Sequence, residues 1–255
     1  MKLSNKLLLL FFISIPVSLF AYNWLLREQY LAGNITVVKY NKNYDSGYVK
    51  KYLPVVKHVV IDGALNSGDP HSQKGSASID WKPAITIEHE KNEERTVLEI
   101  DKLFKDIART KIKGDTLFIS FYKKERTEKL NFYLPNSLIK IRLNSLVSLE
   151  GTHGNFNIGG PFTNQDSMQF FIRSGNLALN KINAKSVNIT ADSLGSINMR
   201  KGNTIGSLSY SLTKKSSLSI ENMNENIRAF NPVKVDSLAV VSISGKAQDM
   251  NKYLQ

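Results

Sequence analysis

A short motif recurs through the second half of the chain: a small polar residue followed by leucine, inside a short alternating run. The leucines are 31, 17, 24 and 20 residues apart, a mean step of 23. Repeats of this size, each too small to bury its own apolar face, are typical of a β-solenoid, in which stacked turns share one core. The leucines expected to form one internal file are Leu146, Leu177, Leu194, Leu218 and Leu238.

An antiparallel β-sandwich with evenly spaced hairpins is the alternative fold. Asn-Gly and Asp-Gly pairs, which form tight two-residue hairpin turns, are missing from this half of the chain. The pattern therefore favours a mainly β protein with a parallel β-helix or solenoid, and the sandwich remains the alternative.

Strands with other patterns precede the repeats. Residues 111–113 and 116–122, joined by Gly114 and Asp115, predict a hairpin. Residues 98–113 have apolar side chains at helical spacing, which indicates either a helix or a short helical turn between strands. Further strands are expected within 55–62, 76–90, 96–100 and 129–134, with a loop at 63–75.

The N-terminal region contains an unbroken apolar stretch, residues 7–26, between Lys6 and Arg27. At about 1.5 Å per residue it is long enough to cross a hydrocarbon core about 30 Å thick. We expect a single-pass anchor in the bacterial cell membrane, a cytoplasmic tail at 1–6, and a C-terminal domain exported to the periplasm or the cell surface.

A cleaved signal peptide, giving a secreted protein, is the alternative. The basic start and the apolar run suit it, but cleavage after Ala21 would place Leu19 where a small residue is preferred. Because the chain has no cysteine, a lipoprotein is excluded.

Residues 27–54 are expected to form a juxtamembrane linker, followed by a β-rich domain at 55–247 and a tail at 248–255. Tyr40, Tyr44, Tyr48 and Tyr52 recur at every fourth position of the linker, among lysines. This spacing indicates an aromatic and basic collar on lipid headgroups. The alternative is an irregular linker in which the tyrosine spacing is due to chance.

The net charge of +12 and the absence of cysteine limit the possible functions. Without thiols the chain has no disulfide, thiolate zinc site or cysteine nucleophile. A basic surface suits anionic lipid or an acidic glycan, and nucleic acid is not expected for an exported domain. Excess lysine also keeps a β-rich surface soluble and its edges unpaired, with no ligand involved.

No motif for metal, phosphate or acyl chemistry stands out, and we predict no catalytic, cofactor or metal residue. Asp69 and His71 could meet a metal, but a third ligand is missing. Asp192 and Asp236 each precede a Ser-Leu pair and are expected at the same corner as turn formers. Other candidate histidines and acids are His58, His89, His153, Glu150, Asp166, Glu221, Glu225 and Asp249. Trp81 is expected to pack in the core or at an edge rather than to form a sugar platform.

Three segments resemble the auto-transporter adhesin head GIN domain family, a domain of unknown function in Bacteroidetes-type envelope proteins. They are the opening KLSNKLLLLFF, the pair VVKHVVIDG and KIKGDTLFISF, and LNFYLPNSLIKIRLNSLVSLEG. The resemblance covers residues 55–247 and implies a right-handed parallel β-helix outside a membrane, with no reaction. The Ser-Gly-Ser-Gly corners of the family are replaced here, for example by residues 192–195 and 214–217.

We therefore expect a non-enzymatic structural or binding module of the bacterial envelope, adhesin-like and held at the membrane by its N-terminal helix. Anionic lipid or glycan is the expected partner class, and the oligomeric state is left open. One alternative is a periplasmic lipid-handling β-jellyroll, which needs an apolar groove between two sheets. The other is a carbohydrate-active β-helix enzyme, which needs two acids about 5 to 10 Å apart in a cleft.

Overall fold

The computed structural model describes residues 3–31, 47–67, 81–90, 94–123, 137–221 and 227–244. The chain divides into two compact units, residues 1–45 and 46–255. The first contains the helix α1 (Leu3–Leu31), with Pro16 inside it, and the second contains all the described strands.

Within the part of the chain that the structure describes, no helix combines the length and the apolar character needed to cross a membrane. The transmembrane span expected at residues 7–26 is therefore not confirmed.

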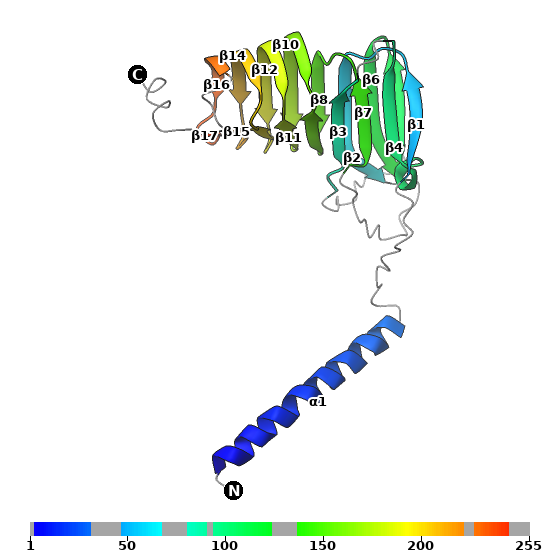
Figure 1. Ribbon diagram of the computed structural model, residues 1–255, viewed down its shortest axis with the longest axis vertical. Helices are drawn as coiled ribbons and strands as arrows, with labels where there is room; N and C mark the ends of the chain where they lie inside the picture. Colours follow the sequence, from blue (N-terminus) through cyan, green and yellow to red (C-terminus); the bar gives the residue numbers. More distant parts are fainter. Residues whose placement is uncertain are drawn as a thin grey trace. The chain divides into compact units, whose positions relative to one another are not determined.

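The second unit is mainly β, as predicted, and its strands form two mixed sheets (Figure 1). Sheet A has the order β1-β4-β7-β3-β9-β11-β13-β15-β17, and sheet B has the order β16-β14-β12-β10-β8-β2-β6-β5. The strands of sheet A are β1 (Tyr48–Leu53), β3 (Ala84–His89), β4 (Thr96–Asp101), β7 (Ile139–Leu143), β9 (Asn155–Gly159), β11 (Asn176–Leu179), β13 (Ser196–Met199), β15 (Ser217–Glu221) and β17 (Val240–Ser244). Those of sheet B are β2 (His58–Ser67), β5 (Ala108–Lys113), β6 (Thr116–Lys123), β8 (Ser148–Thr152), β10 (Phe162–Arg173), β12 (Ile182–Asp192), β14 (Thr204–Leu212) and β16 (Ile227–Val235).

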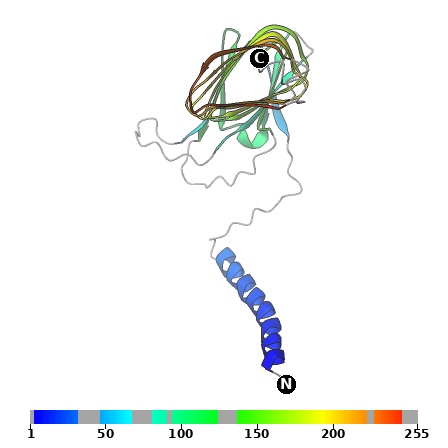
Figure 2. The same cartoon turned by 90° about the vertical axis from the view of Figure 1, so that its left-hand side faces the viewer.

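From β8 onward, successive strands alternate between the two sheets, and each pairs in parallel with the strand two places later. We call one strand of each sheet and its connections a rung; the rungs stack along the molecule, as Figure 2 shows end-on. The antiparallel sandwich considered as an alternative is wrong from β8 onward, because all the described pairings of these strands are parallel.

The earlier strands are less regular. β1, β4 and β7 pair antiparallel, and β5 and β6 form the predicted hairpin, with Gly114 at a φ of 62°. The helical spacing at 98–113 corresponds to the end of β4, the short 3₁₀ helix Lys102–Phe104 and β5, so the helical-turn alternative was correct. Tyr48 and Tyr52 lie on β1 in the sheet, so no helical face gathers them; Tyr40, Tyr44 and the strand expected at 129–134 lie outside the described residues.

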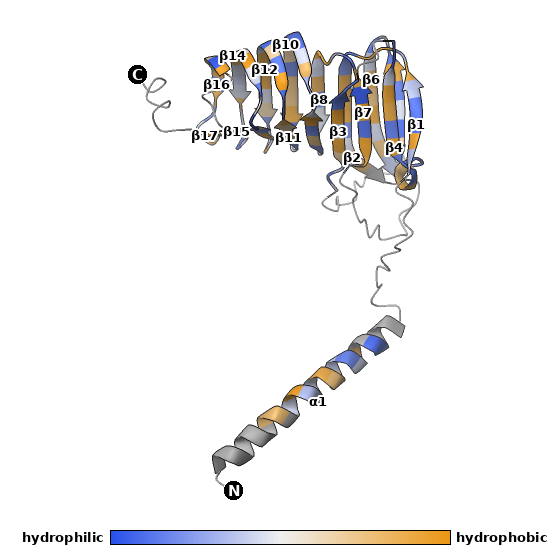
Figure 3. Cartoon of the chain, viewed as in Figure 1, coloured by the Kyte–Doolittle hydropathy of each residue, from blue (hydrophilic) through white to orange (hydrophobic). Residues whose placement is uncertain are grey.

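The core lies between the sheets. Inward and outward residues alternate along most strands of the stack, for example β9 and β15, and Figure 3 shows alternating apolar and polar bands. One file of stacked side chains crosses sheet A in register: Phe156, Leu177, Ile197, Leu218 and Val241. The first four are at most 2% exposed.

The predicted leucine file was therefore wrong at three of its five positions. Leu177 and Leu218 belong to the observed file, and Leu146 is buried outside it, between β7 and β8. Leu194 and Leu238 are 67% and 61% exposed. Leu194 lies in a turn closed by the Gly195 N–H donating to the Asp192 carbonyl, at 2.9 Å, and it has a φ of 68°. Because the turn occupies the Ser-Leu pair, the inward position passes to Ile197.

Candidate functional site

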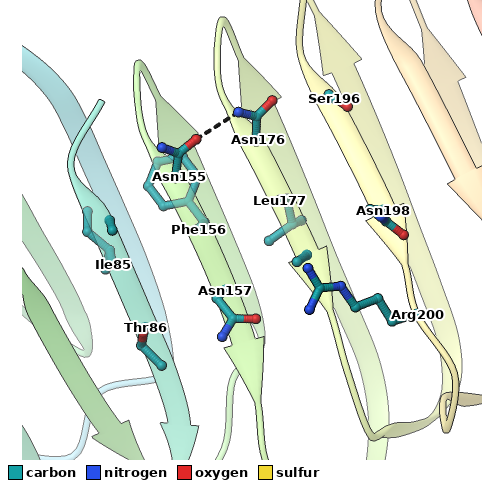
Figure 4. Close-up of a pocket in the computed structure, with 12 residues that line it drawn as sticks. Ile85, Thr86, Asn155, Phe156, Asn157, Asn176, Leu177, Ser196, Asn198 and Arg200 are labelled. Carbon is teal, nitrogen blue, oxygen red and sulfur yellow. Dashed lines mark hydrogen bonds between the residues drawn. The ribbon is translucent and has the colours of Figure 1, made fainter. Parts of the chain in front are cut away.

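An open groove of about 440 Å³ lies on the outer face of sheet A. It crosses the parallel strands β3, β9, β11 and β13 and is mainly lined by amide, hydroxyl and small side chains (Figure 4). Its lining contains no acidic side chain among the described residues. The lining residues that face outward include Thr86, Asn155, Asn157, Asn176, Ala178, Ser196, Asn198 and Arg200.

The pleat of the sheet places these residues together. Phe156, Leu177 and Ile197 point into the core, so their neighbours along each strand point outward. The register aligns Asn155 with Asn176 and Ser196 in one outer row. A second row aligns Asn157 with Ala178 and Asn198, and the short side chain of Ala178 leaves room between the two amides.

Hydrogen bonds between rungs orient part of these amides. The Asn176 Nδ2 donates to the Asn155 Oδ1 at 2.7 Å, and the Asn180 Nδ2 donates to the Asn157 Oδ1 at 3.0 Å. The Asn176 Oδ1 and the Asn157 Nδ2 keep free hydrogen-bonding capacity within the described structure. The Asn198 Oδ1 is shielded from solvent and has no hydrogen-bond partner there.

Arg200 supplies the positive charge of the groove. It directly follows β13, is exposed, and extends its side chain from β13 toward β11 (Figure 4). No carboxylate among the described residues pairs with its guanidinium. The groove thus combines a free guanidinium with amides that donate and accept, a set suited to an anionic group and to sugar hydroxyls.

A second hollow, of about 360 Å³, lies on the outer face of sheet B over β2, β5 and β6. Val60 and Phe118 give it an apolar floor, with Phe118 37% exposed, and Arg109 and Lys111 lie at its rim. The Arg109 guanidinium lies over the Tyr122 ring at 4.2 Å. This hollow is more apolar than the groove on sheet A.

The described histidines lie apart. The His58 Nδ1 is 2.8 Å from the Ser148 Oγ of the neighbouring strand β8, and the His89 ring packs edge-on against Phe162. His153 lies 3.9 Å from Asp62. No group of three His, Cys, Asp or Glu residues that could hold a metal occurs within the described ranges, and Asp69 and His71 lie outside them.

The structure brings Asp192 and Asp236 to the same corner, as predicted. The Lys214 Nζ lies 3.5 Å from the Asp192 Oδ1, and the Lys214 N–H donates to the Asp236 Oδ2 at 3.2 Å. Hydrogen bonding from Thr213 and the charges of Lys214 and Arg173 lower the pKa of Asp192. These contacts indicate a structural corner.

The remaining predicted residues are dispersed. Asp166 pairs with Lys185 at 2.7 Å on the surface, and Glu150 is exposed on β8. Glu221 ends β15, whereas Glu225 and Asp249 lie outside the described residues. Trp81 is 7% exposed and packs against Phe104 and Phe121, so of the two expected placements, core or edge, it takes the core and offers no sugar platform.

The groove residues were missed by the sequence analysis, which treated small polar residues as corner formers. A usable signal was present, since Asn155 and Asn176 lie 21 residues apart, close to the step of the repeat. The sheet register was needed to turn that spacing into adjacent side chains.

No protein-family model and no curated protein matches the sequence. The chain is similar to a candidate adhesin from Bacteroides fragilis NCTC 9343, with 10% identity over 77% of this chain and 97% of that one and a TM-score of 0.40. A candidate adhesin from Parabacteroides distasonis ATCC 8503 has 14% identity over 79% and 96% of the two chains and a TM-score of 0.39. A candidate lipid-binding protein from the same strain has 16% identity over the same shares and a TM-score of 0.36. TM-scores of this size indicate a distant likeness, which defines neither a family nor a function for this chain.

Proposed function

We propose that this chain is a non-enzymatic binding module of the bacterial envelope that holds an acidic glycan on the outer face of sheet A. The observation that carries the proposal is that one groove contains both the free Arg200 guanidinium and amide side chains from three neighbouring strands. A carboxylate or sulfate on a sugar accepts hydrogen bonds from the guanidinium, while the amides of Asn157 and Asn176 match its hydroxyls.

The proposal also includes a parallel β-helix fold and a location on the outer side of the membrane. The alternating, parallel order of the strands from β8 onward supports a parallel β-helix, right-handed as the sequence resemblance implies. The apolar run at residues 7–26 supports delivery of the domain to the outer side of the membrane, by an anchor or a signal peptide.

The two alternatives, a lipid-handling β-jellyroll and a carbohydrate-active enzyme, are less well supported. Both described hollows lie on outer faces of sheets, and the apolar side chains between the sheets are packed, so a lipid groove between sheets has no counterpart there. The groove lining has no acid, and the described lining of the second hollow has only Asp62. General acid–base hydrolysis requires two acids in one cleft.

The test measures binding of the full chain to uronic-acid oligosaccharides and to their methyl-esterified, uncharged forms. We expect Arg200→Gln to weaken binding of the acidic form by about ten- to a hundredfold, since hydrogen bonds to charged groups contribute about 1.5–3 kcal/mol. Binding should also weaken with added salt.

Arg228→Gln is the matched control, because Arg228 is an exposed arginine on β16 of the other sheet and its loss changes net charge equally. Equal losses in both variants would show that only net charge matters. That result, or equal binding of the charged and esterified sugars, would contradict the assignment of the groove.

A further inference from the structure

The last rung exposes positions that earlier rungs bury. Leu218 on β15 is 1% exposed, and Val241, the next member of the same file, is 36% exposed. On sheet B, Leu212 is fully buried and the aligned Val235 is 44% exposed. Figure 2 looks onto this end of the stack, where β16 and β17 are the edge strands of their sheets.

The β16 edge is protected against pairing with another strand. Pro232 has no N–H to donate, and Arg228 and Lys234 flank it on the strand. Antiparallel self-pairing centred on Asn231 would place Arg228 opposite Lys234 of the partner subunit, and like charges directly opposite are destabilising. Natural edge strands use these devices to avoid association.

Within the strand itself, as far as the described residues extend, the β17 edge has no such protection. Its sequence, VVSIS, contains no charge and no proline and is rich in β-branched residues. The Val240 N–H donates to the Ser216 carbonyl at 3.0 Å, so Val240 directs its backbone groups toward β15. Backbone groups alternate in direction along a strand, which leaves those of Val241 and Ile243 facing the open edge.

We propose that β17 pairs antiparallel with β17 of a second copy of this chain, in a register centred on Ser242. This register sets Val241 opposite Ile243 of the partner subunit, and both side chains point inward, so the inner face of sheet A continues across the interface. Ser242 lies opposite its own copy on the outer face, and no charge opposes another within the strand. Symmetric association of identical surfaces is the commonest form of oligomer.

The dimer does not depend on the identity of the ligand. With the proposed glycan, it would place two grooves on one continuous sheet and raise avidity for a repeating polymer. A failure of glycan binding and a failure of dimerisation are therefore separate outcomes.

The first experiment introduces Ser242→Cys into the full chain, which has no other cysteine. Non-hydrogen-bonded partners in an antiparallel pair have Cα atoms about 4.5 Å apart, which suits a disulfide. We expect a disulfide-linked dimer on mild oxidation at low protein concentration. Ser219→Cys is the control, because Ser219 occupies the aligned position one rung earlier, away from the edge.

The second experiment compares Ser242→Lys, Ser242→Glu and their mixture by sedimentation velocity. Each homodimer would bring like charges together, whereas the mixture would pair opposite charges. We expect the mixed dimer to be favoured by about 2- to 30-fold over either homodimer, from cross-strand pair energies. Ser242 is exposed, so the unpaired fold tolerates each change.

A chain ending at Ser244 tests whether residues 245–255 occupy the edge instead. Crosslinking of Ser242→Cys in both the full and the shortened chain supports the dimer. Crosslinking only after the shortening, equal crosslinking of Ser219→Cys, or the absence of a mixed dimer would overturn the proposal.

Discussion

Thr213, which follows β14, donates a hydrogen bond from its Oγ1 to the Oδ1 of Asp192, the last residue of β12, at 2.8 Å. The bond joins neighbouring rungs at a corner where Arg173 also approaches the Asp192 carboxylate, at 3.3 Å. Each rung of a stacked protein contacts mainly its neighbours, so such corner contacts contribute to the cohesion of the stack.

This corner should make stability acid-dependent. The hydrogen bond from Thr213, followed by the charges of Lys214 and Arg173, holds the pKa of Asp192 below its ordinary value of 3.8. A lowered pKa contributes stability that is present above the ordinary value and is lost as pH falls toward the folded-state value. Asp192→Asn should therefore lower the Tm at pH 7 and flatten its decline below about pH 4, measured by thermal unfolding across pH.

Asp166→Asn is the control for this prediction. Asp166 has a lowered pKa through Lys185, but both side chains are more than 80% exposed. Water screens such surface pairs, so we expect a nearly unchanged Tm at every pH. If both variants show the same change in Tm across pH, the corner contacts of Asp192 contribute no more to stability than an exposed ion pair does.

The core file makes a second prediction. Ile197 is fully buried in register with Leu177 and Leu218, whereas Leu194, three residues earlier, is 67% exposed. Ile197→Ala should cost about 2–5 kcal/mol, because it removes buried methylenes and leaves a cavity. Leu194→Ala should stay within about 0.5 kcal/mol. The measurement is the free energy of unfolding in urea for the two variants. A larger loss for Leu194→Ala than for Ile197→Ala would contradict the observed register.

The close approach of β2 to the corner after β8 gives a third prediction. A Cβ at Gly63 would lie 2.4 Å from the His153 backbone oxygen, a contact that forces one strand to move. Gly63→Ala should therefore destabilise the domain by about 1–3 kcal/mol, as overpacking does.

Gly159→Ala is the matched control within a strand, since its nearest atom would be 3.9 Å away. We expect a change within about 0.5 kcal/mol for that variant in the same denaturation assay. Comparable losses in both variants would show that strand glycine as such, and not contact with the corner, sets the cost.

Much of the architecture follows from local patterns. Alternation and β-branched runs predicted most of the described strands, Gly114 and Asp115 predicted the β5–β6 hairpin, and the absence of hairpin turns predicted parallel stacking from β8 onward. The burial of Trp81 and the shared corner of Asp192 and Asp236 were also predicted correctly.

By itself, the sequence determined the β character of the chain, the approximate length of its repeat and the exclusion of thiol chemistry. Only the tertiary structure decided which residues share a file. Side chains alternate between the two faces of a strand, so one extra residue in a turn moves the following side chains to the opposite face. Ser193 and Leu194 adopt positive φ values, so the Ser-Leu pair turns the corner there, and Ile197 takes the core position. The same register assembled the asparagine groove and left β17 as an open edge, two features that depend on which rungs are neighbours.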